Sequence, residues 1–110
     1  MHVPLPQDKK LTVRCRVEPG CLGPAGGELI EEFCNHAQIQ IEHIDADFVH
    51  WQIIPRHDKS LAEIEYTINN KTITRNQAAI YLDKFSRNLD DFEEFFHEIL
   101  IELIAEYTNN

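Results

Sequence analysis

The most reactive side chains in this 110-residue chain are the thiols of Cys15, Cys21 and Cys34. Cys21 lies in the loop of residues 18–24, which holds two prolines and two glycines and directly precedes a predicted helix. A thiol near a helix N-terminus can have a lowered pKa, and its thiolate is the nucleophilic form. Cys21 is therefore the candidate catalytic residue, and an inert loop cysteine is the simpler alternative.

The three cysteines together with His36 also offer the ligand types of a zinc site. Their spacing, Cys-x5-Cys-x12-Cys-x-His, lacks the closely paired ligands of structural zinc sites. Cys15 and Cys34 fall on the apolar sides of a predicted strand and a predicted helix, as buried cysteines do. We therefore predict no metal and no cofactor. The odd number of thiols and the lack of a signal-like apolar stretch in residues 1–10 predict reduced cysteines and a cytoplasmic protein.

A second candidate site is the charged loop that follows a predicted strand, with Arg56, His57 and Lys59. Loops at strand ends commonly carry ligand sites, and an arginine can bind a carboxylate or phosphate through two hydrogen bonds. These three residues are the candidate site for a small anionic ligand. The interpretation that we favour is that Arg56 and Lys59 pair with acids of residues 58–65 at the surface.

The charge of the chain limits its partners. Nineteen Asp and Glu residues against ten Lys and Arg residues give a net charge of −9. This charge repels a phosphate backbone, so we predict no nucleic-acid partner. The longest apolar run is the five residues 78–82, whereas a membrane-spanning helix needs roughly 20, so we predict no membrane segment. Seven acids and no Lys or Arg follow Arg87, a pattern typical of a solvated helix face.

Alternation of apolar and polar residues predicts the strands that must position these side chains. It predicts strands at 11–17, 48–54 and 61–68, and shorter ones near 39–43 and at 72–73. The segment 48–54 is apolar on both faces, which predicts a central strand.

Helical periodicity takes over in three other segments. It predicts a helix at about 26–37 and a second helix after a capping box at Thr74 and Gln77, with Ala78, Tyr81, Leu82 and Phe85 on one face. A third helix is predicted from a second capping signal at 90–93 to about Tyr107. The apolar face of the last helix comprises Phe92, Phe95, Phe96, Ile99, Leu100, Leu103 and Tyr107.

The predicted order is β-α-β-β-β-(β)-α-α, with short strands joined mostly by tight turns. This order indicates an α+β fold with an antiparallel or mixed sheet of four to five strands. We predict a loose N-terminal arm at 1–10 and a single domain at 11–110. The predicted core comprises Val13, Cys15, Leu29, Ile30, Phe33, Trp51, Ile53, Tyr66, Leu82, Phe85, Phe92, Phe96, Ile99 and Leu103.

The last helix carries a second group of apolar residues, Ile101, Ile104 and Ala105, away from its main apolar face. We predict that this group forms an interface. The sequence holds no complete catalytic set, which favours a small non-catalytic binding or interaction protein that acts as a homodimer or with another protein. The alternative is a small enzyme or ligand-binding domain that uses Cys21 or an anion site at Arg56–Lys59.

Overall fold

The computed structural model describes residues 4–108 and contains a four-stranded mixed sheet. The strands are β1 (Leu11–Val17), β2 (Val49–Pro55), β3 (Ile64–Ile68) and β4 (Lys71–Ile73). Their order across the sheet is β2-β1-β3-β4. Strand β1 pairs in parallel with β2 and antiparallel with β3, and β3 and β4 form an antiparallel hairpin. Alternate residues of β1 are buried, as expected for a sheet with one covered face.

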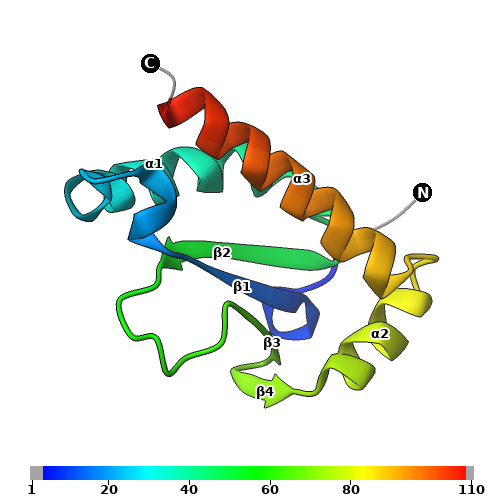
Figure 1. The fold of residues 1–110 in the computed structure, drawn as a ribbon. Helices are drawn as coiled ribbons and strands as arrows, with labels where there is room; N and C mark the ends of the chain where they lie inside the picture. Colours follow the sequence, from blue (N-terminus) through cyan, green and yellow to red (C-terminus); the bar gives the residue numbers. More distant parts are fainter. Residues whose placement is uncertain (1–3, 109–110) are drawn as a thin grey trace.

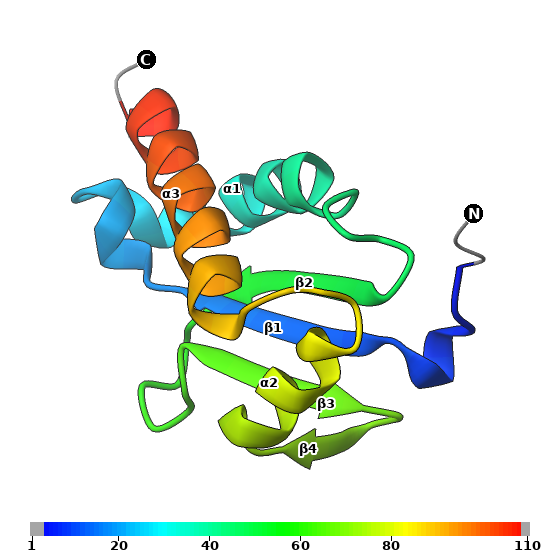
Figure 2. The same ribbon diagram turned by 90° about the vertical axis from the view of Figure 1, so that its right-hand side faces the viewer.

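Three α-helices and two short 3-10 helices complete the fold (Figure 1). They are η1 (Gln7–Lys9), η2 (Pro19–Leu22), α1 (Gly26–Ile41), α2 (Arg75–Asp83) and α3 (Leu89–Thr108). Helices α2 and α3 cross one face of the sheet, and α1 lies along the β2 edge (Figure 2). This arrangement confirms the predicted α+β class.

The core fills the space between these helices and the covered face of the sheet. Eleven of the fourteen predicted core residues are buried, and Leu29, Phe85 and Ile99 are half-buried. Trp51 packs against the rings of Phe92 and Phe96, which joins β2 to α3.

The N-terminal segment makes specific contacts with the domain. The Leu5 amide donates to the carbonyl of Asp47, and the hydroxyl of Tyr81 donates to the carbonyl of Lys9. The looseness of the arm at 1–10 and the domain bounds 11–110 stay predictions, and residues 1–3 and 109–110 lie outside the described part of the chain.

The predicted strand at 39–43 is wrong, because α1 continues to Ile41. Ile41 lies four residues after Ala37 and eight after Phe33, so it extends the helical stripe and is fully buried. The apolar residue Ile39 gave the segment the alternation of a strand, although its side chain is 65% exposed on the outer side of α1. A short alternation of apolar residues fits both periods, and packing decides between them.

The predicted central position of the strand at 48–54 is also wrong, because β2 is an edge strand and β1 is central. The free edge of β2 is covered by a side chain of α1. Gln38 donates from Nε2 to the Trp51 carbonyl at 2.9 Å and accepts at Oε1 from the Ile53 amide at 2.8 Å. One amide side chain thus replaces part of a neighbouring strand.

Several element boundaries also differ from the predictions by one to three residues, those of β3 and α3 among them. Strand β3 begins at Ile64 rather than at 61. Helix α3 begins at Leu89, one residue before the predicted capping signal, and the side chain of Asn88 accepts from the Asp91 amide there. The predicted capping box at Thr74 and Gln77 is confirmed.

Candidate functional site

The outward face of α3 is the surface with the most distinctive chemistry. We call it the α3 ridge and define it by the exposed residues Asp91, Glu94, Phe95, Glu98, Ile101, Glu102 and Ala105. Phe95 is 54% exposed and Ile101 is 64% exposed. In helical projection, Phe95 and Ile101 occupy opposite edges of the ridge, with the acids and Ala105 between them. The ridge is therefore an acidic stripe with an apolar side chain on each border.

The acids of the ridge carry negative charge that no Lys or Arg ion pair compensates within the described residues 4–108. Helix α3 contains seven Asp and Glu residues and no Lys or Arg. Arg75 at the start of α2 reaches Asp90 and Glu93, which lie beside the ridge. Within residues 4–108, no Lys or Arg forms an ion pair with a ridge acid. Glu94, Glu98 and Glu102 follow one another at four-residue spacing, an arrangement in which like charges repel.

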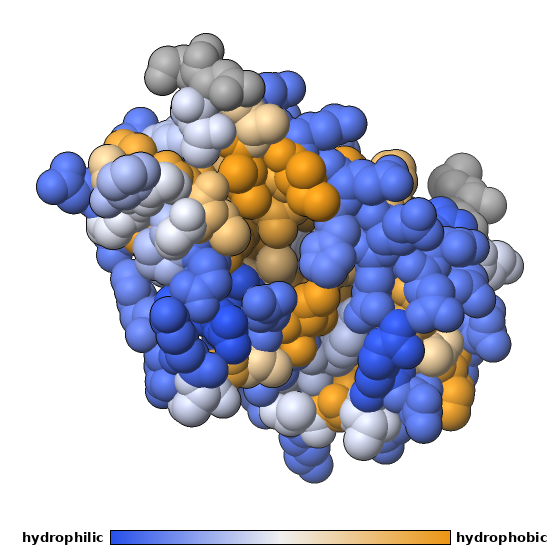
Figure 3. Space-filling model, in the orientation of Figure 1, coloured by the Kyte–Doolittle hydropathy of each residue, from blue (hydrophilic) through white to orange (hydrophobic). Residues whose placement is uncertain are grey.

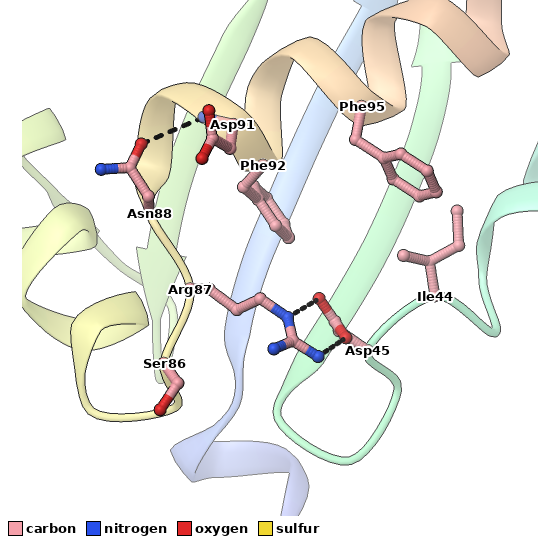
Figure 4. A pocket seen from close by; sticks show the side chains of 8 residues that line it. All are labelled: Ile44, Asp45, Ser86, Arg87, Asn88, Asp91, Phe92 and Phe95. Carbon is pink, nitrogen blue, oxygen red and sulfur yellow. Dashed lines mark hydrogen bonds and ion pairs between the residues drawn. The ribbon is translucent and has the colours of Figure 1, made fainter.

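A pocket of about 450 Å³ opens at the N-terminal end of the ridge (Figure 4). We call it the Phe95 pocket. Its lining residues are Ile44, Asp45, Ser86, Arg87, Asn88, Asp91, Phe92 and Phe95. The close view shows Phe92, Phe95 and Ile44 along one side, and the Arg87 guanidinium against Asp45 on the other. The pocket thus combines an apolar wall with a neutralised ion pair.

The ion pair in the Phe95 pocket is held by local backbone and ring contacts. Arg87 donates from Nε and Nη2 to the two carboxylate oxygens of Asp45, at 3.1 and 3.0 Å. The guanidinium carbon also lies 5.8 Å from the centre of the Phe48 ring. Asp45 and Ser86 both adopt positive φ angles, 50° and 61°, in the two turns that shape the pocket. These turns bring the end of α1 and the start of α3 together.

A second depression lies on the other side of α3, where Figure 3 shows a hollowed apolar band below the helix. It is a groove of about 100 Å³. Its lining residues are Cys15, Arg16, Val17, Glu18, Cys21, Glu63, Ile64, His97, Leu100 and Ile104. The groove therefore brings the exposed thiol of Cys21, on η2, to the same depression as the imidazole of His97, on α3.

The other two thiols are buried in the core. Burial raises the pKa of Cys15 to about 11 and the pKa of Cys34 to about 12, so both thiols are protonated at neutral pH. His36 is exposed on α1 and contacts the ring of Tyr107. Within residues 4–108, no three His, Cys, Asp or Glu residues are arranged to hold a metal ion.

The predicted anion site lies in the loop between β2 and β3. The Arg56 side chain is only 17% exposed. It donates to Glu18 and Glu63 and to the carbonyls of Lys59 and Leu61. His57 and Lys59 are exposed. Arg56 is thus engaged with acids and carbonyls of its own chain, and the anion site stays a prediction.

The structure places the predicted interface residues on two surfaces. Ile101 and Ala105 are exposed on the ridge, whereas Ile104 is half-buried in the groove beside it. The sequence placed Phe95 on the buried face of the helix, which is wrong. In helical projection Phe95 lies at the border of that face, beside the acids of the ridge, and it is 54% exposed.

Comparison with known proteins gives one result: no family model, no curated protein and no solved structure matches this chain. Among residues 4–108, no helix is long and apolar enough to cross a membrane.

Proposed function

We propose that this protein is a small cytoplasmic, non-catalytic interaction protein whose working surface is the α3 ridge. It acts by binding a second copy of itself or another protein. The observation that carries this proposal is the exposure of two large apolar side chains, Phe95 and Ile101, on the two borders of the ridge. Burying one such side chain contributes roughly 1.5–3 kcal/mol, so a partner that covers both gains substantially.

The surroundings of these side chains support the same function. A single exposed apolar residue is ordinary on a protein surface. Here Phe95 borders a pocket lined by Phe92 and Ile44, and Ile101 lies one turn from the groove residue Ile104. Apolar side chains that lie beside pockets are typical anchors of protein interfaces.

The state of association tests this proposal. We expect Ile101→Glu to abolish the association of the wild-type protein with itself or with a captured partner, because it places a charge where apolar contact is needed. Ile39→Glu is the matched control, since Ile39 is equally exposed on α1. Sedimentation at two salt concentrations measures self-association. Affinity capture with the wild type and both variants as baits measures partner binding, and circular dichroism checks folding.

The outcomes separate clearly. Loss of association in Ile101→Glu with retention in Ile39→Glu supports the ridge as the working surface. Two results together refute the role of the ridge: the protein is monomeric at high concentration in both salts, and the wild type and Ile101→Glu capture the same proteins.

A second candidate function rests on the groove that contains Cys21 and His97. A histidine beside a thiol can act as its base, so a small ligand-binding or thiol-based activity is the alternative. We expect such an activity to give an alkylation rate of Cys21 that falls in His97→Gln. An alkylation rate that is unchanged in the variant rejects this alternative.

A further inference from the structure

The identity of the partner follows from how the chain uses its own cations. All five arginines form ion pairs with acids of the same chain: Arg14 and Arg16 with Glu65, Arg56 with Glu18 and Glu63, Arg75 with Asp90 and Glu93, and Arg87 with Asp45. A second copy therefore offers mainly lysines to the ridge, on a molecule whose net charge is −9. Contact between two ridges brings carboxylates together. The ridge is complementary to a cationic partner instead.

The Phe95 pocket favours an apolar group at the centre of that partner. Its wall is made by Ile44, Phe92 and Phe95, and Arg87 is the one Lys or Arg among its lining residues. Because Asp45 accepts two hydrogen bonds from Arg87, the guanidinium has little attraction left for an anion. An apolar side chain gains contact there without displacing the ion pair.

The spacing along α3 fixes how far apart the partner's groups must be. At 1.5 Å per residue, Ile101 lies about 9 Å from Phe95 along the helix axis, and Glu98 and Glu102 lie about 5 and 10 Å from it. A helical partner meets both apolar contacts with side chains about two turns apart. Lys or Arg residues between and beside those anchors meet the acids of the ridge.

We infer that the α3 ridge and the Phe95 pocket bind a basic amphipathic protein segment, with an apolar anchor in the pocket and Lys or Arg side chains against Glu94, Glu98 and Glu102. This inference rests on the proposed function, because it names the partner of the same surface. Recognition of an amphipathic segment needs apolar anchors for affinity and opposite charges for orientation.

Three synthetic peptides of about 20 residues test the inference with the full chain. The first is built of Leu and Lys, with Leu recurring every three or four residues. The second has Glu in place of Lys, and the third has Ser in place of Leu. Calorimetry and amide chemical shifts report binding and its location. We expect only the first peptide to bind, with shifts at Ile44, Phe95 and residues 98–102.

Salt and charge reversal then separate a specific site from general attraction to an acidic protein. We expect an affinity loss of about tenfold between about 50 and about 300 mM salt. The double variant Glu98→Lys, Glu102→Lys should lose at least about tenfold, and Phe95→Ser should lose a similar factor. The matched control is Glu28→Lys, Glu31→Lys on α1, where binding should change less than about twofold.

Several results overturn the inference. Equal loss in the ridge pair and the α1 pair shows general charge attraction. Binding of the Ser-containing peptide as tight as that of the Leu peptide shows that the pocket contributes nothing. If no cationic peptide binds while Ile101→Glu still abolishes association, the partner is not basic and the proposed function stands. If Ile101→Glu also has no effect, both fail.

Discussion

At the scale of single residues, Gly26 shows how a missing side chain positions the loop that carries Cys21. A Cβ atom at this position would lie 1.7 Å from the carbonyl oxygen of Pro19, so only glycine lets η2 pack against the start of α1. This contact holds Cys21 at the rim of the groove beside α3. A Cβ atom on the next residue, Gly27, would have no other atom within 4 Å.

We predict that Gly26→Ala destabilises the protein by about 1–3 kcal/mol or more, because the backbone of Pro19 must move. Gly27→Ala is the matched control and should be neutral or stabilise by up to about 1 kcal/mol, since alanine lowers the entropy of the unfolded chain. Urea unfolding of both variants measures the difference. Equal stability of the two variants would show that η2 does not pack as described.

The buried thiol of Cys15 makes the free energy of unfolding depend on pH in the alkaline range. Burial raises its pKa from 9.0 to about 11, so the folded state holds a proton that the unfolded state releases. The contribution of Cys15 is fully present below pH 9 and is lost as the pH rises through 11.

We expect the free energy of unfolding to fall by about 1 kcal/mol from this group between pH 8 and pH 10. Urea unfolding at the two pH values measures the slope. Cys15→Ala should make the slope shallower, whereas Cys21→Ala should leave it unchanged because Cys21 is exposed. A slope that is the same in all three proteins contradicts the burial of the Cys15 thiol.

At the scale of elements, the periodicity of apolar residues predicts whether a segment is a helix or a strand, but it does not predict which elements lie next to one another. The α+β class, the strand at 11–17 and the long C-terminal helix follow from apolar spacing alone. The edge position of β2 does not, because it depends on Gln38, whose side chain covers that edge from α1. The ridge residue Ile101 could be found from projection of one helix. The same projection places Phe95 only at the border of the buried face, and its exposure depends on whether another segment covers it, which one helix does not show.

The edge contact of Gln38 gives a prediction at this scale. We expect Gln38→Ala to lower stability by about 1–3 kcal/mol, because two hydrogen bonds to the β2 backbone are lost. Gln40→Ala, at an exposed position on the same helix, should change stability by less than about 0.5 kcal/mol. Thermal unfolding compares the two. The exposed edge should also make Gln38→Ala aggregate faster on heating, which light scattering measures.

At the scale of the whole molecule, the charges are divided between layers. Helices α1 and α3 contain ten Asp and Glu residues and no Lys or Arg. Arg14 and Arg16 lie on β1, and both pair with Glu65 on β3. The helical layer therefore carries most of the uncompensated negative charge, and a cationic partner is attracted to this side before contact.

The same charge distribution has a cost that a single substitution reveals. Glu98 lies four residues from both Glu94 and Glu102, and each such pair of like charges costs a few tenths of a kcal/mol. We predict that Glu98→Lys raises the free energy of unfolding by about 1 kcal/mol, because it turns two repulsions into two attractions. Urea unfolding at low salt measures the gain, and high salt should reduce it.

Asp47→Lys is the control for net charge. Asp47 is exposed in the turn before β2, outside any helix, so it does not belong to a series of acids at four-residue spacing. It changes the total charge by the same amount and should have a smaller effect. If both variants gain equally, overall charge and not the ridge is responsible. If Glu98→Lys raises the free energy of unfolding and lowers the affinity for the peptide of Leu and Lys, then the ridge acids destabilise the fold and strengthen binding. That opposition is what a surface specialised for a cationic partner requires.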